Sequence, residues 1–214
     1  VASRRFHLNE SDRYLMLLSA QAMAEFLSLL LLLGLVRFHE QTPRALGLQR
    51  SRAVRLVLGG TLAWLCFAPT FFLIALTVNW LRAIAGLPPD PQEIVRLLQD
   101  MESGGIHYSL LTVTCLSAVV IAPLYEEVLF RGFLYGWLRN HLRPIPSAVL
   151  CAVLFTIVHS PVAVWPPIFA LGLFLTYAYE RTGSLWTSIA IHFIHNSAVV
   201  AILLAQVFLE TPIS

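Results

Sequence analysis

The chain has 214 residues, of which 57% are hydrophobic and only 12% are charged, and its formal net charge is +2. Soluble domains carry about 25% charged residues, because a domain of this size must cover a large surface with polar groups. The composition therefore excludes a soluble globular enzyme, a disordered chain and a nucleic-acid-binding protein. It indicates an integral membrane protein whose surroundings are the lipid bilayer.

Six apolar stretches follow one another along the chain, and a membrane-spanning helix needs about 20 mostly apolar residues. The first is too long for the apolar region of a signal peptide, so we expect a retained span. The stretches are continuous and lack the alternation of a membrane barrel, which predicts an all-α bundle of about six transmembrane helices. In chain order they are 14–36, 54–80, 108–138, 147 to beyond His159, 167–179 and 185–209.

Between the second and third spans, Asp90, Pro91 and Glu93 form a typical helix start. They predict a short helix, either on the membrane surface or as an ordinary loop helix. We expect one integrated domain with two parts, namely residues 1–105, which hold the N-terminal spans and this interfacial loop, and residues 106–209, which hold the membrane core.

The distribution of arginine predicts the orientation, because cytoplasmic loops are enriched in basic residues. The loop 37–55 carries five arginines, and the later connections then alternate between acidic or arginine-free and arginine-containing loops. This pattern places loop 37–55 in the cytoplasm. The N-terminal tail, which contains Arg4, Arg5 and Arg13, does not fit the alternation, and its side of the membrane stays open.

Several charged or polar residues lie inside the predicted spans, although a charge near the bilayer centre costs at least about 2.5–3.5 kcal/mol. Such residues are therefore functional candidates. In each motif two side chains four residues apart share one helix face. The motifs are E-E-x-x-x-R (Glu126, Glu127, Arg131), F-x-x-x-H (Phe155, His159) and H-x-x-x-N (His192, Asn196).

Measured from the predicted inner loops, the motif residues fall at two depths. With a rise of about 1.5 Å per residue, one set lies roughly 12 Å deep and the other roughly 18–20 Å deep. The shallower set is Arg131, Phe155 and His192, and the deeper set is Glu126, His159 and Asn196. Matching depths on three helices predict one shared cavity that opens to the cytoplasmic side.

A carboxylate and an imidazole on facing helices are the groups needed to activate water as a nucleophile. His192 and Asn196 can donate hydrogen bonds to a developing oxyanion. These parts favour peptide hydrolysis without a covalent intermediate. The helical zinc motif H-E-x-x-H and the serine motif G-x-S-x-G are both absent. A metal stays open as an alternative, with Glu126, His159 and His192 as a zinc ligand set.

Each of these features has a simpler interpretation when it is taken alone. An ion pair between Glu127 and Arg131 can be structural, and Phe155 can serve packing. His195, inside the third motif, is expected to be a satisfied core residue, and Gln21 and Glu25 are expected to form hydrogen bonds between helices. Two other classes of function use similar buried residues: a proton-coupled transporter or relay, which no inverted repeat supports, and a non-catalytic membrane scaffold or immunity partner.

Taken together and in order, the motifs resemble the CPBP (Abi) family of intramembrane peptidases, which includes the type II CAAX prenyl endopeptidases and bacteriocin-processing and self-immunity proteins. The resemblance is strong from Ala122 to Asn196. Besides the three motifs, it rests on Pro123, Phe130, Gly132, Phe169, Gly172 and the turn at 180–185, and Ala45 to Leu48 resembles the family's approach to the second span.

The resemblance implies that Glu126 is the catalytic base, that His159 positions the water, and that His192 and Asn196 form the oxyanion site. Glu127, Arg131 and Phe155 would support these groups. The implied mechanism uses no metal and no other cofactor. The implied partner is a peptide or lipidated peptide, and the implied location is a bacterial cytoplasmic membrane, with several spans and the site open to the cytoplasm. The oligomeric state is not predicted.

Overall fold

The computed structural model describes residues 10–38, 47–48, 53–87, 108–159 and 161–210. Within these ranges all regular elements are helical, so the predicted all-α membrane bundle is confirmed. Five helical segments are long and apolar enough to cross a membrane. The predicted fourth span is instead a shorter apolar helix, α7 (Pro144–Ile157), of 14 residues.

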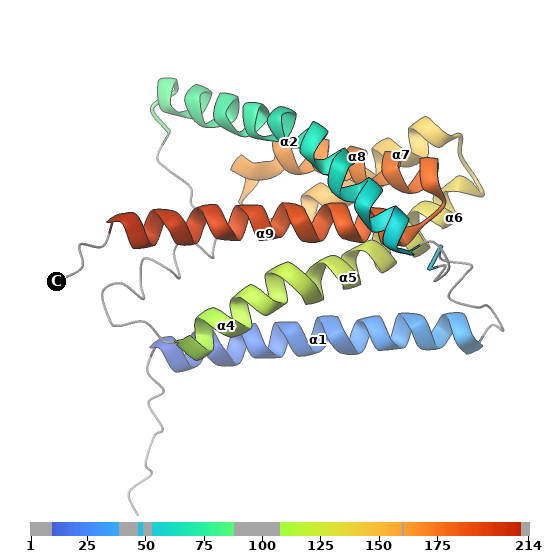
Figure 1. Cartoon of the computed structure of the whole chain (residues 1–214), viewed down its shortest axis with the longest axis horizontal. Helices are drawn as coiled ribbons and strands as arrows, with labels where there is room; N and C mark the ends of the chain where they lie inside the picture. Colours follow the sequence, from blue (N-terminus) through green and yellow to red (C-terminus); the bar gives the residue numbers. More distant parts are fainter. Residues whose placement is uncertain (1–9, 39–46, 49–52, 88–107, 160, 211–214) are drawn as a thin grey trace, which may run out of the picture.

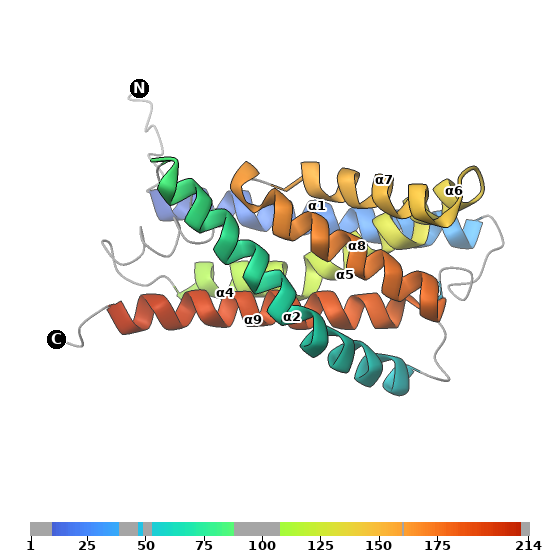
Figure 2. The same ribbon diagram turned by 90° about the horizontal axis from the view of Figure 1, so that it is seen from above.

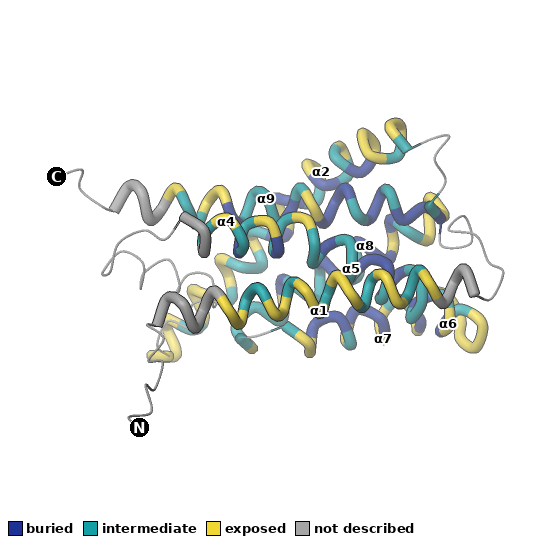
Figure 3. The backbone as a smooth tube through the Cα atoms, turned by 90° about the horizontal axis from the view of Figure 1, so that it is seen from below, coloured by how far each residue is buried: buried dark blue, intermediate teal, exposed yellow. Residues whose placement is uncertain are grey.

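α1 (Glu10–Phe38) and α9 (Leu185–Glu210) both run along the length of the bundle, and α4 (Tyr108–Leu116) and α5 (Ala122–Glu127) lie between them (Figure 1). α1 packs mainly on α4 and α5. Much of its surface is exposed (Figure 3), with large apolar side chains such as Leu17, Leu27 and Leu31 pointing outward. An apolar exposed surface is what a helix in contact with lipid presents.

The core lies where four helices meet. α2 (Ala53–Ile84) crosses α9 obliquely (Figure 2) and also packs on α8 (Trp165–Thr182), which in turn packs on α7 and α9. Buried apolar side chains from all four helices fill the junction, among them Trp64, Phe71, Phe155, Leu171, Leu175 and Ile191. This packing holds α9 and α7, which carry two of the three motifs, in fixed positions.

The third span is one long helix with two wider segments. α4 is followed by the π-helical turn η3 (Ser117–Ile121), α5, the π-helical segment η4 (Val128–Tyr135) and α6 (Gly136–Arg139). π-helical turns are rare and occur often at functional sites. Here they flank the turn that carries Glu126 and Glu127.

Pro123 explains a contact between the third span and α9. In η3 the N–H of Ala122 bonds the carbonyl of Ser117, five residues earlier. Pro123 has no N–H, so it cannot form the next bond of this register, which would go to the carbonyl of Ala118. The side-chain amide of Asn196 donates to it at 2.7 Å, which satisfies a polar group at membrane depth.

The turn between α8 and α9 sets where α9 begins. Gly183 has a φ of +61° and donates its N–H to the Tyr179 carbonyl at 2.7 Å, as in a typical left-handed helix end. Ser184 Oγ then accepts the Trp186 N–H at 3.3 Å, which caps α9, and donates to the Gly47 carbonyl at 3.0 Å. The cap and the contact with Gly47 anchor the N-terminal end of α9, which is predicted to face the cytoplasm.

Two expectations require correction or stay open. The fourth span was expected to continue beyond His159, but α7 ends at Ile157 and His159 lies in the bend that follows, before the short 3₁₀ turn η5 (Val162–Val164). Pro161 disfavours helix in the residue before it, so the helix cannot continue. The helix predicted after Asp90 lies outside the described residues, and the division at residue 105 stays a prediction.

Candidate active site

A cavity of about 350 Å³ lies inside the bundle, between α1, the third span, α8 and α9. The four side chains predicted to be catalytic all line it: Glu126, His159, His192 and Asn196. Phe155 also contributes to the wall. The structure therefore brings together residues that lie up to 70 positions apart in the sequence, as the matching depths predicted.

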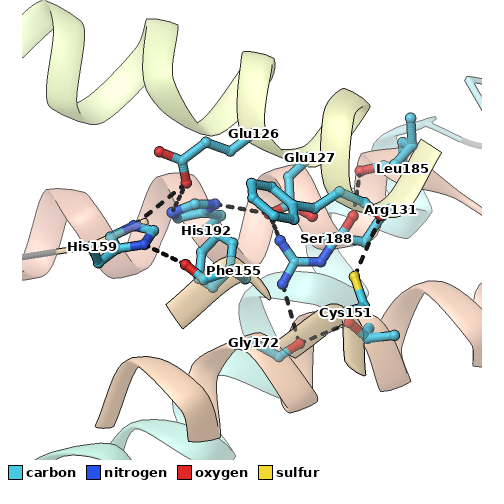
Figure 4. Close-up of polar contacts among 12 residues, drawn as sticks. Glu126, Glu127, Arg131, Cys151, Phe155, His159, Gly172, Leu185, Ser188 and His192 are labelled. Carbon is cyan, nitrogen blue, oxygen red and sulfur yellow. Dashed lines mark hydrogen bonds and ion pairs between the residues drawn. The ribbon is translucent and has the colours of Figure 1, made fainter. Parts of the chain in front are cut away.

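Glu126 points between two imidazole rings (Figure 4). Its Oε2 lies 3.8 Å from Nε2 of His159 and 3.8 Å from Nε2 of His192. These distances are too long for direct hydrogen bonds, and Oε2 has no other hydrogen-bond partner within the described residues. A water molecule near these three atoms could donate hydrogen bonds to two of them at once.

Glu127 lies on the sealed side of the same turn and connects two helices. Its Oε1 accepts hydrogen bonds from Nη1 of Arg131 and Nδ1 of His192, both at 2.8 Å. The side chains of Glu127 and Arg131 are fully buried, and Nη2 of Arg131 donates to the Gly172 carbonyl at 3.1 Å. A buried carboxylate needs such partners, so the predicted supporting residues form one connected network beneath His192.

The anchoring contacts decide which ring nitrogens face Glu126. Nδ1 of His192 donates to the Glu127 carboxylate, and Nδ1 of His159 donates to the Phe155 carbonyl at 2.6 Å. A neutral imidazole has one N–H, so both neutral rings present a bare Nε2 lone pair to Glu126. Three acceptors then converge, which favours a bound water that donates protons. With Nδ1–H held by Glu127, His192 can donate to an oxyanion from Nε2 only as an imidazolium.

Phe155 holds the two histidines apart. Its ring centroid lies 4.6 Å from that of His159 and 5.9 Å from that of His192, while the Arg131 guanidinium carbon lies 4.4 Å from the Phe155 centroid. Gly172 on α8 leaves the space for this ring, because a Cβ there would lie 3.2 Å from Phe155 Cδ1. The motif phenylalanine therefore both packs and positions the polar groups.

Asn196 has a contact that the sequence analysis missed. Nδ2 already donates one hydrogen to Ala118, so its amide ties α9 to the third span. A side-chain amide carries two N–H groups, and the second is not used by any contact in the described residues. This role depends on a π-helical turn directly before Pro123, and the sequence does not reveal that turn.

Within the described residues, five further polar residues line the cavity, and sequence reasoning gave them no place in the site: Gln21, Glu25, Thr114, Ser117 and His195. Gln21 and Glu25 of α1 were expected to bond between helices, but Nε2 of Gln21 donates to Oε1 of Glu25 within α1, at 3.0 Å. His195 was expected to be a satisfied core residue, and it also reaches the cavity wall. The feature of the sequence that could have identified these residues is that they are polar residues within apolar spans.

The zinc alternative can be compared with this geometry. Glu126, His159 and His192 supply suitable donor types, but ligands of a tetrahedral zinc ion lie about 3.3–3.5 Å from one another, compared with the 3.8 Å observed here. Within the described ranges no group of three His, Cys, Asp or Glu side chains is arranged to hold a metal ion. These two distances are longer than those between bound zinc ligands, and the absence of a metal in the reaction stays a prediction.

Comparisons with known proteins concern the part of the chain that holds this site. Residues 108–198 match the family model of the type II CAAX prenyl endopeptidase Rce1-like proteins, which bears out the resemblance inferred from the motifs. The chain is 28% identical over 88 residues to "Putative membrane peptidase YdiL" of Bacillus subtilis, a match covering 41% of this chain and 36% of that protein. It is 30% identical over 87 residues to "Membrane-embedded CAAX protease MroQ" of Staphylococcus aureus, covering 38% of this chain and 35% of that protein.

The aligned segment thus spans about a third of the length of these curated relatives. No solved structure gives a significant match. The spanning helices and the membrane-peptidase relatives together identify the chain as an integral membrane protein.

Proposed function

Residues 108–198 carry the sequence pattern of the Rce1-like type II CAAX prenyl endopeptidases, and on this premise we propose that the chain is an intramembrane endopeptidase that cleaves membrane-associated or lipidated peptides. The observation that carries the proposal is the position of Glu126, whose Oε2 lies 3.8 Å from Nε2 of both His159 and His192 at the wall of an internal cavity. A carboxylate between two imidazoles suits the activation of water.

In the proposed reaction, a water bound between Glu126 and His159 attacks the scissile carbonyl carbon. A new C–O bond forms, the carbonyl oxygen becomes an oxyanion, and the proton of the water passes to the Glu126 carboxylate. Glu126 then gives this proton to the amide nitrogen, the C–N bond breaks, and the products are a carboxylic acid and an amine. Atoms and charges balance with water as the only co-reactant.

The other residues of the network hold this geometry. His159 is fixed through Phe155, and His192 is fixed through Glu127, so neither ring must reorganise during the reaction. Asn196 offers its free N–H to the oxyanion, and His192 does so when it is protonated. We further propose that the site opens to the cytoplasm of a bacterial cell, which the arginine-rich loop 37–55 supports.

The test uses the full chain in lipid nanodiscs with an internally quenched peptide that carries a prenylated cysteine, and the same peptide without the lipid. Glu126→Gln and His159→Ala should lower the cleavage rate by about 10²–10⁴-fold, the usual contribution of general acid–base groups. Glu180→Gln is the matched control, since Glu180 is an exposed carboxylate that bonds Arg139 and Tyr135 away from the cavity.

Quantitative proteomics of membrane peptides in cells that express wild type or Glu126→Gln would identify the natural substrate as the peptide that stays uncut in the variant. Full activity in Glu126→Gln contradicts the proposal. Proton-driven uptake into liposomes without cleavage of any peptide would favour a transporter instead.

A further inference from the structure

His195 belongs to the wall of the cavity that Glu126 and His192 line. It lies on α9 three residues after His192 and one residue before Asn196, so the three side chains cover one face of the helix. Its side chain is 3% exposed. A histidine buried to this degree beside a reaction cavity needs a defined hydrogen-bonding state, because either ring nitrogen can carry the proton.

Trp64 of α2 sets that state. Its indole N–H donates to Nδ1 of His195 at 3.4 Å, in a buried contact between residues 131 positions apart. An indole nitrogen can only donate, so Nδ1 of His195 must be the bare acceptor. The Phe71 ring meets the imidazole edge-on, with centroids 4.3 Å apart and planes at 77°, which prevents the ring from turning over.

The neutral ring therefore carries its hydrogen on Nε2. Some buried polar atoms of the described residues are sealed and lack a hydrogen-bond partner, but Nε2 of His195 is not one of them. Because His195 lines the cavity, we take this N–H to be accessible from it. His192 is in the opposite state, because its Nδ1–H is held by Glu127 and its Nε2 is bare. Of the two neighbouring histidines, only His195 presents an N–H in its neutral form.

We propose that Nε2–H of His195, together with the free N–H of Asn196, binds the oxyanion, and that Trp64 positions it for this role. The inference rests on the proposed peptidase function and assigns the donor role to a residue outside the recognised H-x-x-x-N motif. His195 keeps its proton throughout the reaction. It stabilises charge without waiting for a protonation step, which suits a site where preorganised donors act.

The first test reads the protonation state without any substrate. Side-chain ¹⁵N NMR of histidine-labelled protein, with His195 assigned by its loss in His195→Gln, should show Nε2 protonated and Nδ1 bare. Trp64→Phe removes the indole donor but keeps an aromatic ring, and it should give a mixture of the two tautomers. A His195 that carries its hydrogen on Nδ1 in the wild type overturns the inference.

The second test separates kcat from KM in the cleavage assay. His195→Leu should lower kcat by about 10²–10³-fold, the loss for one oxyanion donor, with little change in KM. His195→Gln keeps an amide N–H near the Nε2 position and should recover part of this loss. His141→Leu is the matched control, because His141 is exposed and, among the described residues, its side chain contacts the Trp137 carbonyl and ring away from the cavity.

A third measurement uses a phosphinic peptide that mimics the tetrahedral intermediate. His195→Leu should weaken binding of this inhibitor by the same factor by which it lowers kcat. The matching uncleaved peptide should bind equally well to Glu126→Gln and to the Glu126→Gln/His195→Leu double variant. If Glu126→Gln abolishes cleavage and His195→Leu does not lower kcat, the inference on His195 fails alone. If Glu126→Gln cleaves as well as wild type, the proposed function fails.

Discussion

His192 and Glu127 form a 2.8 Å contact between Nδ1 and Oε1, in which the histidine side chain is 3% exposed and the carboxylate is fully buried. The contact joins α9 to α5 and turns the opposite nitrogen of the ring toward Glu126. Adjacent glutamates thus have different tasks, since one is sealed and holds a histidine while the other faces the cavity. The same division explains why both carboxylates of the E-E pair can exist at membrane depth.

Removing one member of the buried Glu127–Arg131 pair should destabilise the protein strongly. Arg131→Met leaves the buried Glu127 carboxylate without its cationic partner, and we expect a loss of about 3–5 kcal/mol in the free energy of unfolding. Glu127→Leu/Arg131→Met removes both charges and should recover much of this stability without recovering cleavage, because His192 loses its anchor. Denaturant titration in micelles measures the first effect, and the peptide assay measures the second.

The exposed pair Arg139–Glu180 is the control for this experiment. Its side chains are 32% and 38% exposed, and such pairs contribute about 1 kcal/mol or less. Glu180→Gln should therefore change the unfolding free energy much less than Arg131→Met. Equal effects of the two substitutions would contradict the buried network.

Gly172→Ala should disturb the packing of α7 on α8. The new Cβ would lie 3.2 Å from Phe155 Cδ1 and 3.3 Å from Cα and Cβ of Ala152, and overpacking of this kind costs about 1–3 kcal/mol. Because Phe155 touches both cavity histidines, cleavage should fall as well. Gly136→Ala meets nothing within 4 Å and should stabilise α6 by about 0.5–1 kcal/mol. The unfolding temperature should therefore fall in Gly172→Ala and rise in Gly136→Ala, and the cleavage rate should fall only in Gly172→Ala.

The two roles of Asn196 can be separated with Pro123. Asn196→Ala leaves the Ala118 carbonyl without a donor, which should cost about 1–3 kcal/mol. Pro123→Ala supplies a backbone N–H to that carbonyl, so Asn196→Ala should cost less stability in this background. Cleavage should remain low in the double variant because the oxyanion donor is still missing. Additive stability losses in the cycle would rule out the link through Ala118.

Chelation tests the proposed metal-free chemistry directly. Because the Glu126, His159 and His192 atoms are spaced more widely than zinc ligands, we expect phenanthroline and EDTA to leave the cleavage rate of purified protein unchanged, with less than stoichiometric zinc by elemental analysis. Loss of cleavage that added zinc restores would assign these three residues to a metal site instead.

Some features follow from the sequence alone because they depend on local composition and regular helix geometry. The low charge content forces a membrane bundle, and the constant rise of a helix places Glu126, His159 and Asn196 at similar depth. These regularities were sufficient to predict one cavity lined by residues from three separate helices. Pro161 limits how far this helix can extend, but the end of α7 at Ile157 was not predicted, because the bend there also involves the His159 side chain bonding back to the Phe155 carbonyl.

Tertiary structure alone decided how each polar atom is used. Asn196 meets a carbonyl freed by Pro123, and Trp64 fixes the tautomer of His195 from a helix 131 positions away. Hydrogen bonds act over about 3 Å and depend on direction, so the partners of the His192 and His195 Nδ1 atoms are determined by how helices cross. Spacing along one helix does not reveal such partners.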